Sequence, residues 1–339
     1  MNLGRSSEPG PRPTVADLLA AVHVVRIPMR VRFRGITVRE VALLHGPAGW
    51  GEFGPFLEYA PAESSRWLAA AIEAAWQDWP APVRHRIGVN ATVPAVPATQ
   101  VADVLARFPG VRTVKVKVAE PGQSLADDLD RVAAVRDVLG PAGVVRVDAN
   151  GGWSVDQARE ALRHLVGYGL DYAEQPCATV EDLAELRRLL AAAGIDVRIA
   201  ADESIRKAAD PMRVRDLEAA DVIVVKVAPL GGVRAALRII EDCGLPAVVS
   251  SALDTSVGIA GGVALAAALP DLPYDCGLGT VALLDGDVTT EPMLPVDGTL
   301  RVRSVEPDPG LLARFAAPPE RHRWWVERIE ASAAYLKLD

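Results

Sequence analysis

The feature that most constrains the fold is a regular alternation of short apolar runs and amphipathic segments, which begins near residue 88. The eight apolar runs are 89–93, 111–118, 144–148, 170–174, 197–202, 222–227, 247–250 and 274–277. Helix-like stretches between them include 124–139, 154–168, 179–193 and 233–243. Alternation of this kind predicts βαβ units and a parallel sheet. Eight runs favour a closed barrel, with a doubly wound open sheet as the alternative.

The segments on either side of this repeat have a different pattern. Between residues 14 and 87 we expect strands at 22–25 and 38–44, a turn at 46–49 and a helix within 62–79. After residue 283 the repeat stops, and 295–339 predicts loops and a terminal helix that packs back on the first segment. We therefore predict a disordered tail (1–13), an α+β capping domain (14–87 plus 283–339) and a barrel domain (88–282).

Composition excludes several classes of function. The chain has 339 residues and a formal net charge of -8, which argues against a general nucleic-acid binder. It contains no run of about 18 apolar residues that could span a membrane. Its three cysteines form no CxxC pair, which fits a reducing cytoplasm. Five scattered histidines without HxxxH spacing argue against a zinc site of the usual His/Cys kind.

Lysines lie in two runs that should be buried. Both faces of a barrel strand are covered, so a charge there is costly unless it is paired or bound to metal. Strand alternation places Lys115 and Lys117 on the face opposite the valines of 114–118. Because valines suit the outer, helix-covered face, both lysines should point inward. Lys226 stands near the end of the sixth run.

Carboxylates end three consecutive runs between these lysines. Asp148, Glu174 and Asp202 are 26 and 28 residues apart, about one strand–helix unit each, so they should lie at equivalent heights. Taken singly, each residue has an ordinary explanation, such as a helix cap, a loop acid or a solvated strand face. The order Lys, Asp, Glu, Asp, Lys at matching strand ends indicates a site at the end of the barrel where active sites lie.

Three neighbouring carboxylates predict a bound cation, because they cannot all ionise at close range without one. An all-oxygen ligand set favours Mg²⁺, with Mn²⁺ possible. Such an ion keeps positions open for a substrate carboxylate and stabilises the charge that appears when an α-proton leaves. We expect lowered pKa values for the neighbouring lysines, which would make a neutral amine base available.

The motifs that carry these residues resemble those of the enolase superfamily, in its muconate-lactonizing subgroup. They are Lys-Val-Lys at 115–117, Asp-Ala-Asn-Gly-Gly-Trp at 148–153, Glu-Gln-Pro at 174–176, Ala-Asp-Glu-Ser at 201–204, and Lys226. The resemblance implies a (β/α)7β modified TIM barrel with an α+β capping domain. Within the subgroup, stretches 29–35, 51–56 and 250–258 most resemble the o-succinylbenzoate synthase family.

This resemblance also implies a reaction. The substrate would be 2-succinyl-6-hydroxy-2,4-cyclohexadiene-1-carboxylate, which loses water to become o-succinylbenzoate in menaquinone biosynthesis. Asp148, Glu174 and Asp202 would bind Mg²⁺. Lys117 would remove the α-proton and return it to the departing hydroxide, and Lys226 would stabilise the resulting enolate as a cation.

Further residues receive supporting roles by the same resemblance. Lys115 would support the electrostatics of Lys117. The substrate-binding residues would be Ser250, Ser251, Gly258 and Arg34, and the groups behind the site Asn150 and Glu203. For the arginines of 30–34, a solvated edge strand explains the pattern equally well, as capping or turn roles do for Asn150 and Glu203.

Other functions remain open at this point. The nearest is an N-acylamino acid racemase or dipeptide epimerase, although no Asp-x-Asp pair follows the seventh run to receive a peptide ammonium group. Muconate cycloisomerisation is a further rival. A rival of a different class is a non-catalytic metal- or carboxylate-binding barrel, which would not need paired lysines. The expected partner is a small carboxylate substrate, with no nucleic acid and no membrane; the oligomeric state is left open.

Overall fold

The computed structural model describes residues 12–20, 22–207 and 210–338, so most of the predicted disordered tail lies outside the described residues. The capping part begins with helix α1 (Val15–Ala20) and a three-stranded antiparallel sheet. Its strands are β1 (Val22–Phe33), β2 (Ile36–Gly46) and β3 (Gly49–Phe53). Strand β1 is longer than expected, because it continues through the arginine-rich stretch into a hairpin with β2. Arg30 and Arg32 thus lie exposed on an edge strand, which is one of the two interpretations that the sequence leaves open.

Helix α2 (Pro61–Trp76) packs tightly against this sheet. A Cβ atom on Gly46 would lie 2.3 Å from the Ala75 carbonyl oxygen, and one on Gly51 would lie 2.0 Å from that of Ala71. Only glycine permits so close an approach of strand and helix backbone. The helix and the sheet share an apolar core with the C-terminal helix α13 (Pro319–Leu336), which includes the buried Trp325.

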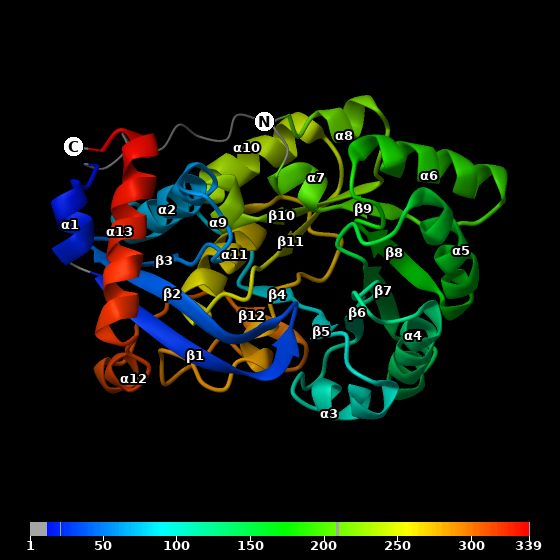
Figure 1. Ribbon diagram of the computed structural model, residues 1–339, viewed down its shortest axis with the longest axis horizontal. Helices are drawn as coiled ribbons and strands as arrows, with labels where there is room; N and C mark the ends of the chain where they lie inside the picture. Colours follow the sequence, from blue (N-terminus) through cyan, green and yellow to red (C-terminus); the bar gives the residue numbers. More distant parts are fainter. Residues whose placement is uncertain (1–11, 21, 208–209, 339) are drawn as a thin grey trace.

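A parallel sheet with helices on its outer side forms the second part (Figure 1). Its strands are β5 (Ala91–Val93), β6 (Thr113–Lys117), β7 (Val144–Asp148), β8 (Leu170–Glu174), β9 (Ile199–Ala201), β10 (Val222–Lys226) and β11 (Ala247–Ser250). The helices between and after them are α3 (Val101–Leu105), α4 (Leu125–Leu139), α5 (Val155–Leu165), α6 (Val180–Ala192), α7 (Glu203–Arg206), α8 (Arg213–Asp216), α9 (Val227–Leu230), α10 (Val233–Cys243) and α11 (Ser256–Ala268). Ser124, Ser154 and Thr179 cap three of them by accepting a hydrogen bond from a first-turn N–H.

The strands follow one another in sequence order across the sheet, from β5 to β11. The eighth predicted strand closes the curve with single parallel bridges, Cys276 to Val89 on one side and Gly277 to Ser250 on the other. It therefore joins the first and last strands without forming a regular ladder. The predicted fold, a modified barrel with a capping domain, is confirmed, and the open doubly wound alternative is wrong.

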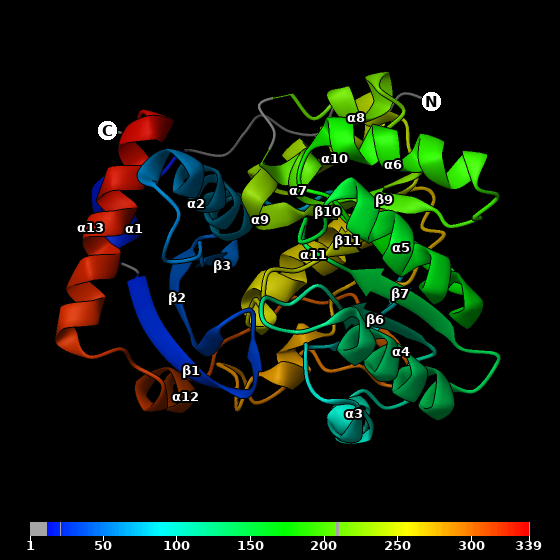
Figure 2. The same cartoon turned by 45° about the vertical axis from the view of Figure 1, so that its right-hand side comes forward.

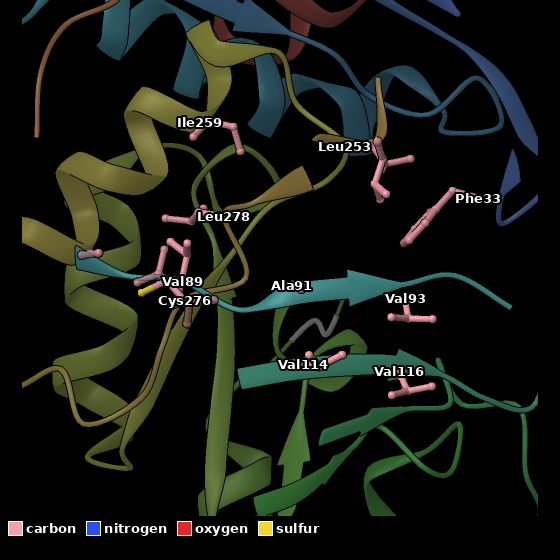
Figure 3. Packing of buried hydrophobic residues seen from close by; sticks show 14 of the residues in the cluster. Phe33, Val89, Ala91, Val93, Val114, Val116, Leu253, Ile259, Cys276 and Leu278 are labelled. Carbon is pink, nitrogen blue, oxygen red and sulfur yellow. The ribbon is translucent and has the colours of Figure 1, made fainter. Parts of the chain in front are cut away.

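The two faces of the barrel strands carry different apolar side chains, as alternation predicts. Val93, Val114 and Val116 belong to the large core cluster, which also contains residues of the surrounding helices (Figure 3). A separate small cluster fills the barrel interior: Tyr172, Ala200, Val222, Val224 and Val248. Four polar residues each follow a member of this cluster by two positions and so face the interior as well: Glu174, Asp202, Lys226 and Ser250.

The chain returns to the capping part at its C-terminal end. Strand β12 (Thr299–Arg301) pairs with β4 (Arg86–Gly88), and helix α12 (Pro309–Arg314) leads to α13. Helix α13 lies along α2 and β1, as Figures 1 and 2 both show. The terminal helix thus packs where the sequence pattern predicts. Within the described residues, no helix is long and apolar enough to cross a membrane.

Two buried ionisable side chains of the cap hold it against the barrel. Arg39 of β2 donates a hydrogen bond to the carbonyl oxygen of Leu253, 3.0 Å away in the loop after β11. Glu52 of β3 accepts from the backbone N–H groups of Thr255 (3.0 Å) and Gly258 (3.2 Å), at the start of α11. Because the first N–H groups of a helix have no partner within it, the cap supplies the acceptor that α11 needs.

We predict that Glu52 makes stability depend on pH. Burial and the neighbouring Asp254 raise the pKa of Glu52 to about 8, above its ordinary value of 4.5. A raised folded-state pKa means that stability is lost as the pH rises from about 4.5 through about 8. Glu52→Gln keeps an acceptor for Thr255 and Gly258 but cannot ionise. Its free energy of unfolding should therefore fall less than that of the wild type between about pH 5 and about pH 9 in denaturant titrations.

A second variant separates ionisation from hydrogen bonding. Glu52→Ala leaves the donors of Thr255 and Gly258 without an acceptor, so it should lower stability by about 1–3 kcal/mol at both pH values. If the free energy of unfolding fell equally with rising pH in the wild type and in Glu52→Gln, the protonation argument would be contradicted. Full stability of Glu52→Ala would show that the capping contact contributes nothing.

Candidate active site

A cavity of about 170 Å³ lies between the cap and the carboxyl ends of the barrel strands. Its polar lining comes mostly from the barrel, namely Thr92, Lys115, Lys117, Arg206, Lys207, Lys226, Ser250, Ser251 and Thr280. The cap supplies Phe33, Arg34, Ile36, Phe56, Glu58, Tyr59 and Trp67. The cavity therefore exists only where the two parts meet.

The three predicted lysines all reach this cavity. Lys115 and Lys117 project from β6, and Lys226 ends β10. Each side chain is nearly buried, with residue exposures of 5%, 8% and 9%. Strands β7, β8 and β9 lie between β6 and β10 in the curled sheet, so Lys117 and Lys226 approach the cavity from opposite sides.

The three predicted carboxylates lie beneath the lysines. Asp148 and Glu174 are direct neighbours in the ladder between β7 and β8. Asp202 follows the end of β9, on the next strand of the sheet. All three are buried, with exposures of 1% or less. Asp148 and Glu174 lie at the same level of the ladder, whereas Asp202 stands two residues beyond Ala200, the ladder partner of Glu174.

Each carboxylate is held by cationic donors. Lys115 Nζ lies 2.9 and 2.8 Å from the two oxygens of Glu174 and 3.4 Å from Asp148. Lys117 Nζ donates to Asp148, and Lys226 Nζ lies 2.6 Å from Asp202 Oδ2. Each of the three carboxylates thus has a lysine ammonium group in contact with it.

The pKa values respond to this arrangement in different directions. Burial, together with the charge of Asp148, raises the pKa of Glu174 to about 7. Burial opposes ionisation of Asp148, but the charges of Lys117 and Lys115 lower its pKa. Burial and the neighbouring charge of Lys115 lower the pKa of Lys117 despite the attraction of Asp148. A lowered pKa makes the neutral amine of Lys117 easier to reach.

The expectation of a lowered pKa is wrong for Lys115. Burial acts in the expected direction, but the charges of Glu174 and Asp148 outweigh it and raise the pKa of Lys115. Lys115 therefore stays a cation beside the two carboxylates. A permanent positive charge next to Lys117 is the arrangement that the supporting role of Lys115 requires.

The donor set fits a hard divalent cation. Asp148, Glu174 and Asp202 offer six oxygens in a buried space, and ammonium groups occupy the place of positive charge. The described residues contain no group of three or more His, Cys, Asp or Glu side chains already gathered for a metal ion, and lysines contact the three carboxylates instead. Nearby, Glu203 Oε2 is buried without a hydrogen-bond partner within the described residues.

Asn150 and Glu203 lie behind these groups, as expected. Asn150 Oδ1 accepts from Lys117 Nζ at 2.8 Å, and its Nδ2 donates to Glu203 Oε1 at 3.3 Å. Arg206 joins them: its Nη2 lies 2.6 Å from Glu203, and its Nε lies 3.0 Å from Asp202. Side-chain contacts thus run from Lys117 through Asn150, Glu203 and Arg206 to Asp202.

The predicted substrate-binding residues do not all reach the cavity. Ser250, Ser251 and Arg34 line it. Ser251 Oγ donates to the Gly277 carbonyl oxygen at 2.7 Å. Gly258 is not in the lining, and its N–H donates to Glu52 instead. A contact between Gly258 N–H and substrate would require that hydrogen bond to break.

Several lining residues were missed in the sequence. Phe33, Phe56, Tyr59 and Trp67 form an aromatic wall from the cap, and Phe56 meets Tyr59 and Trp67 edge to face. No local pattern marks these residues, because the docking of two separate parts brings them to the barrel. Arg206 could have been found, since it stands four residues after Asp202 in a short helix and so shares its side.

Two protein-family models match this chain. Residues 24–75 match the family model described as "Enolase N-terminal domain-like", and residues 98–316 match "Enolase C-terminal domain-like". The o-succinylbenzoate synthase of Mycobacterium leprae is 60% identical over 325 residues, 96% of this chain and 95% of that protein. The chain belongs to the o-succinylbenzoate synthase family of the enolase superfamily. The Mycolicibacterium smegmatis o-succinylbenzoate synthase matches equally, at 60% identity over 96% of this chain and 98% of its own length.

Solved structures resemble this member of the o-succinylbenzoate synthase family in fold. A muconate lactonizing enzyme from Pseudomonas fluorescens, solved with muconolactone, superimposes with a TM-score of 0.74 at 22% identity, over 88% of this chain and 98% of that one. An N-succinyl Arg/Lys racemase from Bacillus cereus gives a TM-score of 0.70 at 18% identity, over 88% and 97%. At these identities the likeness establishes the architecture alone.

Proposed function

We propose that this chain dehydrates 2-succinyl-6-hydroxy-2,4-cyclohexadiene-1-carboxylate to o-succinylbenzoate in menaquinone biosynthesis, as a carbon–oxygen lyase. The observation that carries the proposal is the pair Lys117 and Lys226 on opposite sides of one cavity above three buried carboxylates. O-succinylbenzoate synthases that are 58–60% identical over nearly the whole chain support the same substrate. The partner in this proposal is a small carboxylate.

Asp148, Glu174 and Asp202 are the residues that would hold Mg²⁺, or Mn²⁺ in its place. When bound, the ion would supply Lewis-acid stabilisation to the substrate carboxylate. To let the carboxylates bind it, Lys115, Lys117 and Lys226 must give up contacts that they make with Glu174, Asp148 and Asp202, respectively.

Lys117 is the proposed base. Its Nζ lines the cavity, and burial lowers its pKa, so a neutral amine can take the proton α to the substrate carboxylate. Asn150 accepts from the same Nζ and fixes its direction. The protonated Lys117 then gives the proton to the departing hydroxide, which leaves as water and balances the reaction.

Lys226 is the proposed electrostatic partner. As an ammonium ion on the opposite side of the cavity it stabilises the negative charge that develops on the substrate when the α-proton leaves. Ser250 and Ser251, on the adjacent strand and its end, place hydroxyl groups where the second carboxylate of the substrate can accept hydrogen bonds. The aromatic wall of the cap excludes water from the reacting centre.

Two assays test the proposal. Turnover of the cyclohexadiene substrate with Mg²⁺ present should produce o-succinylbenzoate, followed by absorbance. In parallel, α-proton exchange of an N-succinyl amino acid into deuterated water measures racemase chemistry, for which Lys117 and Lys226 are also suitably placed. Exchange without dehydration would instead establish the racemase. If the protein catalysed neither reaction but still bound a carboxylate, it would be a non-catalytic binding barrel.

A further inference from the structure

The hairpin between β1 and β2 carries three arginines at alternate positions. Arg30 and Arg32 lie in β1, and Arg34 follows in the turn with a φ of 49°. Although the turn and an irregular register after Pro28 break strict strand alternation, all three arginines line the same groove. Arg30 pairs with Asp285 at 3.2 Å. In the described part of the chain, Arg32 and Arg34 take part in no ion pair.

These arginines line a groove of about 700 Å³ between the hairpin and the barrel. We call it the arginine groove and define it by Arg30, Arg32, Arg34 and Arg107. Two acids, Asp103 and Glu120, also line it, so the arginines are in excess. Arg107 contributes an independent signal, because its Nη1 is buried without a hydrogen-bond partner among the described residues. A guanidinium with an unused donor favours an anionic ligand.

The arginine groove and the active site share one lining residue. Arg34 lines both the groove and the catalytic cavity. Charged residues of the catalytic cavity are Arg34, Lys115, Lys117, Arg206, Lys207, Lys226 and a single acid, Glu58. The chain as a whole carries a net charge of -8. The cavity lysines contact Asp148, Glu174 and Asp202, whereas the arginines of the groove exceed its two acids, so a small anion is attracted first to the groove.

We propose that the arginine groove is an entrance site for small dicarboxylates, which captures the dianionic substrate and raises kcat/KM. The proposal rests on the proposed function for the identity of that dianion. Association guided by such fields rises about 10- to 1,000-fold and falls steeply with salt. Arg32 is the residue that isolates this effect, because it lines the groove but not the catalytic cavity.

The test compares Arg32→Glu with Arg159→Glu, which makes the same charge change on the outer helix α5. At about 10 mM salt, where the Debye length is about 30 Å, Arg32→Glu should lower kcat/KM about 10-fold through KM and not kcat. At about 1 M salt, where that length is about 3 Å, the difference should fall below about twofold. Arg159→Glu should match the wild type at both salt concentrations.

Binding of o-succinylbenzoate, measured by titration calorimetry, tests the groove without turnover. The dissociation constant should rise in Arg32→Glu at low salt and recover at high salt. Because no reaction is needed, this arm still reports on the groove if dehydration fails, so the two proposals can fail separately. Equal behaviour of Arg32→Glu and Arg159→Glu overturns the entrance site, as does an effect that persists at high salt or that falls on kcat. A larger loss for inorganic phosphate than for o-succinylbenzoate overturns the assigned ligand class.

Discussion

Replacement of Lys117 by alanine should lower the rate of dehydration about 10²- to 10⁴-fold, the usual contribution of a positioned general base. Lys117 Nζ lies in the cavity, where Asp148 and Asn150 hold it and burial lowers its pKa. Steady-state assays at saturating Mg²⁺ measure the loss, which should fall on kcat. Circular dichroism and thermal unfolding establish that the variant is folded.

A second substitution at this position separates proton transfer from simple charge. Lys117→Arg keeps the positive charge beside Asp148, but a guanidinium does not lose its proton at working pH. We therefore expect it to be as inactive as Lys117→Ala while it still binds o-succinylbenzoate. Substantial activity in Lys117→Arg would show that the residue acts only through its charge. Full activity in Lys117→Ala would remove it from the mechanism.

Loss of one metal-site carboxylate should abolish activity at physiological Mg²⁺ concentration. Glu174→Gln keeps the shape of the side chain but removes the charge that faces Asp148 and Asp202, so Mg²⁺ affinity should fall at least about 100-fold. Calorimetric titration of each protein with Mg²⁺ measures the change. Chelation of the wild type should likewise stop turnover, and added Mg²⁺ should restore it.

A carboxylate on the same strand provides the control. Asp171 of β8 pairs with Arg146 at 2.8 Å, away from the catalytic cavity. Asp171→Asn should lower the melting temperature but leave Mg²⁺ affinity unchanged. If Glu174→Gln bound Mg²⁺ like the wild type, or if chelation left turnover intact, the three carboxylates would need another explanation.

Strand alternation was enough to predict the interior of the barrel. The apolar runs are buried on both faces, so a charged residue near a strand end had to point either to the core or to the site. The valines of β6 decided that choice for Lys115 and Lys117, and both line the cavity. The same parity holds for Arg146, which lies two residues before Asp148, yet its side chain faces the base of the barrel between Tyr172 and Tyr274.

Contacts between distant segments could not be predicted in this way. Glu52 reaches Thr255 across 203 positions, and no periodicity records such a pairing. Glu52 also accepts the N–H of Gly258, a residue that the sequence predicts to bind substrate. The pKa of Lys115 was missed for a related reason: its sign depends on how near Glu174 and Asp148 lie, and distance is a property of the fold.

A crystal structure of the protein with Mg²⁺ and o-succinylbenzoate tests the central claim most directly. The account predicts one ion within about 2.0–2.1 Å of oxygens from Asp148, Glu174 and Asp202. It also predicts the product carboxylate on that ion, with Lys117 Nζ and Lys226 Nζ on opposite faces of the product. An ion bound elsewhere, or either lysine turned away from the product, would contradict it.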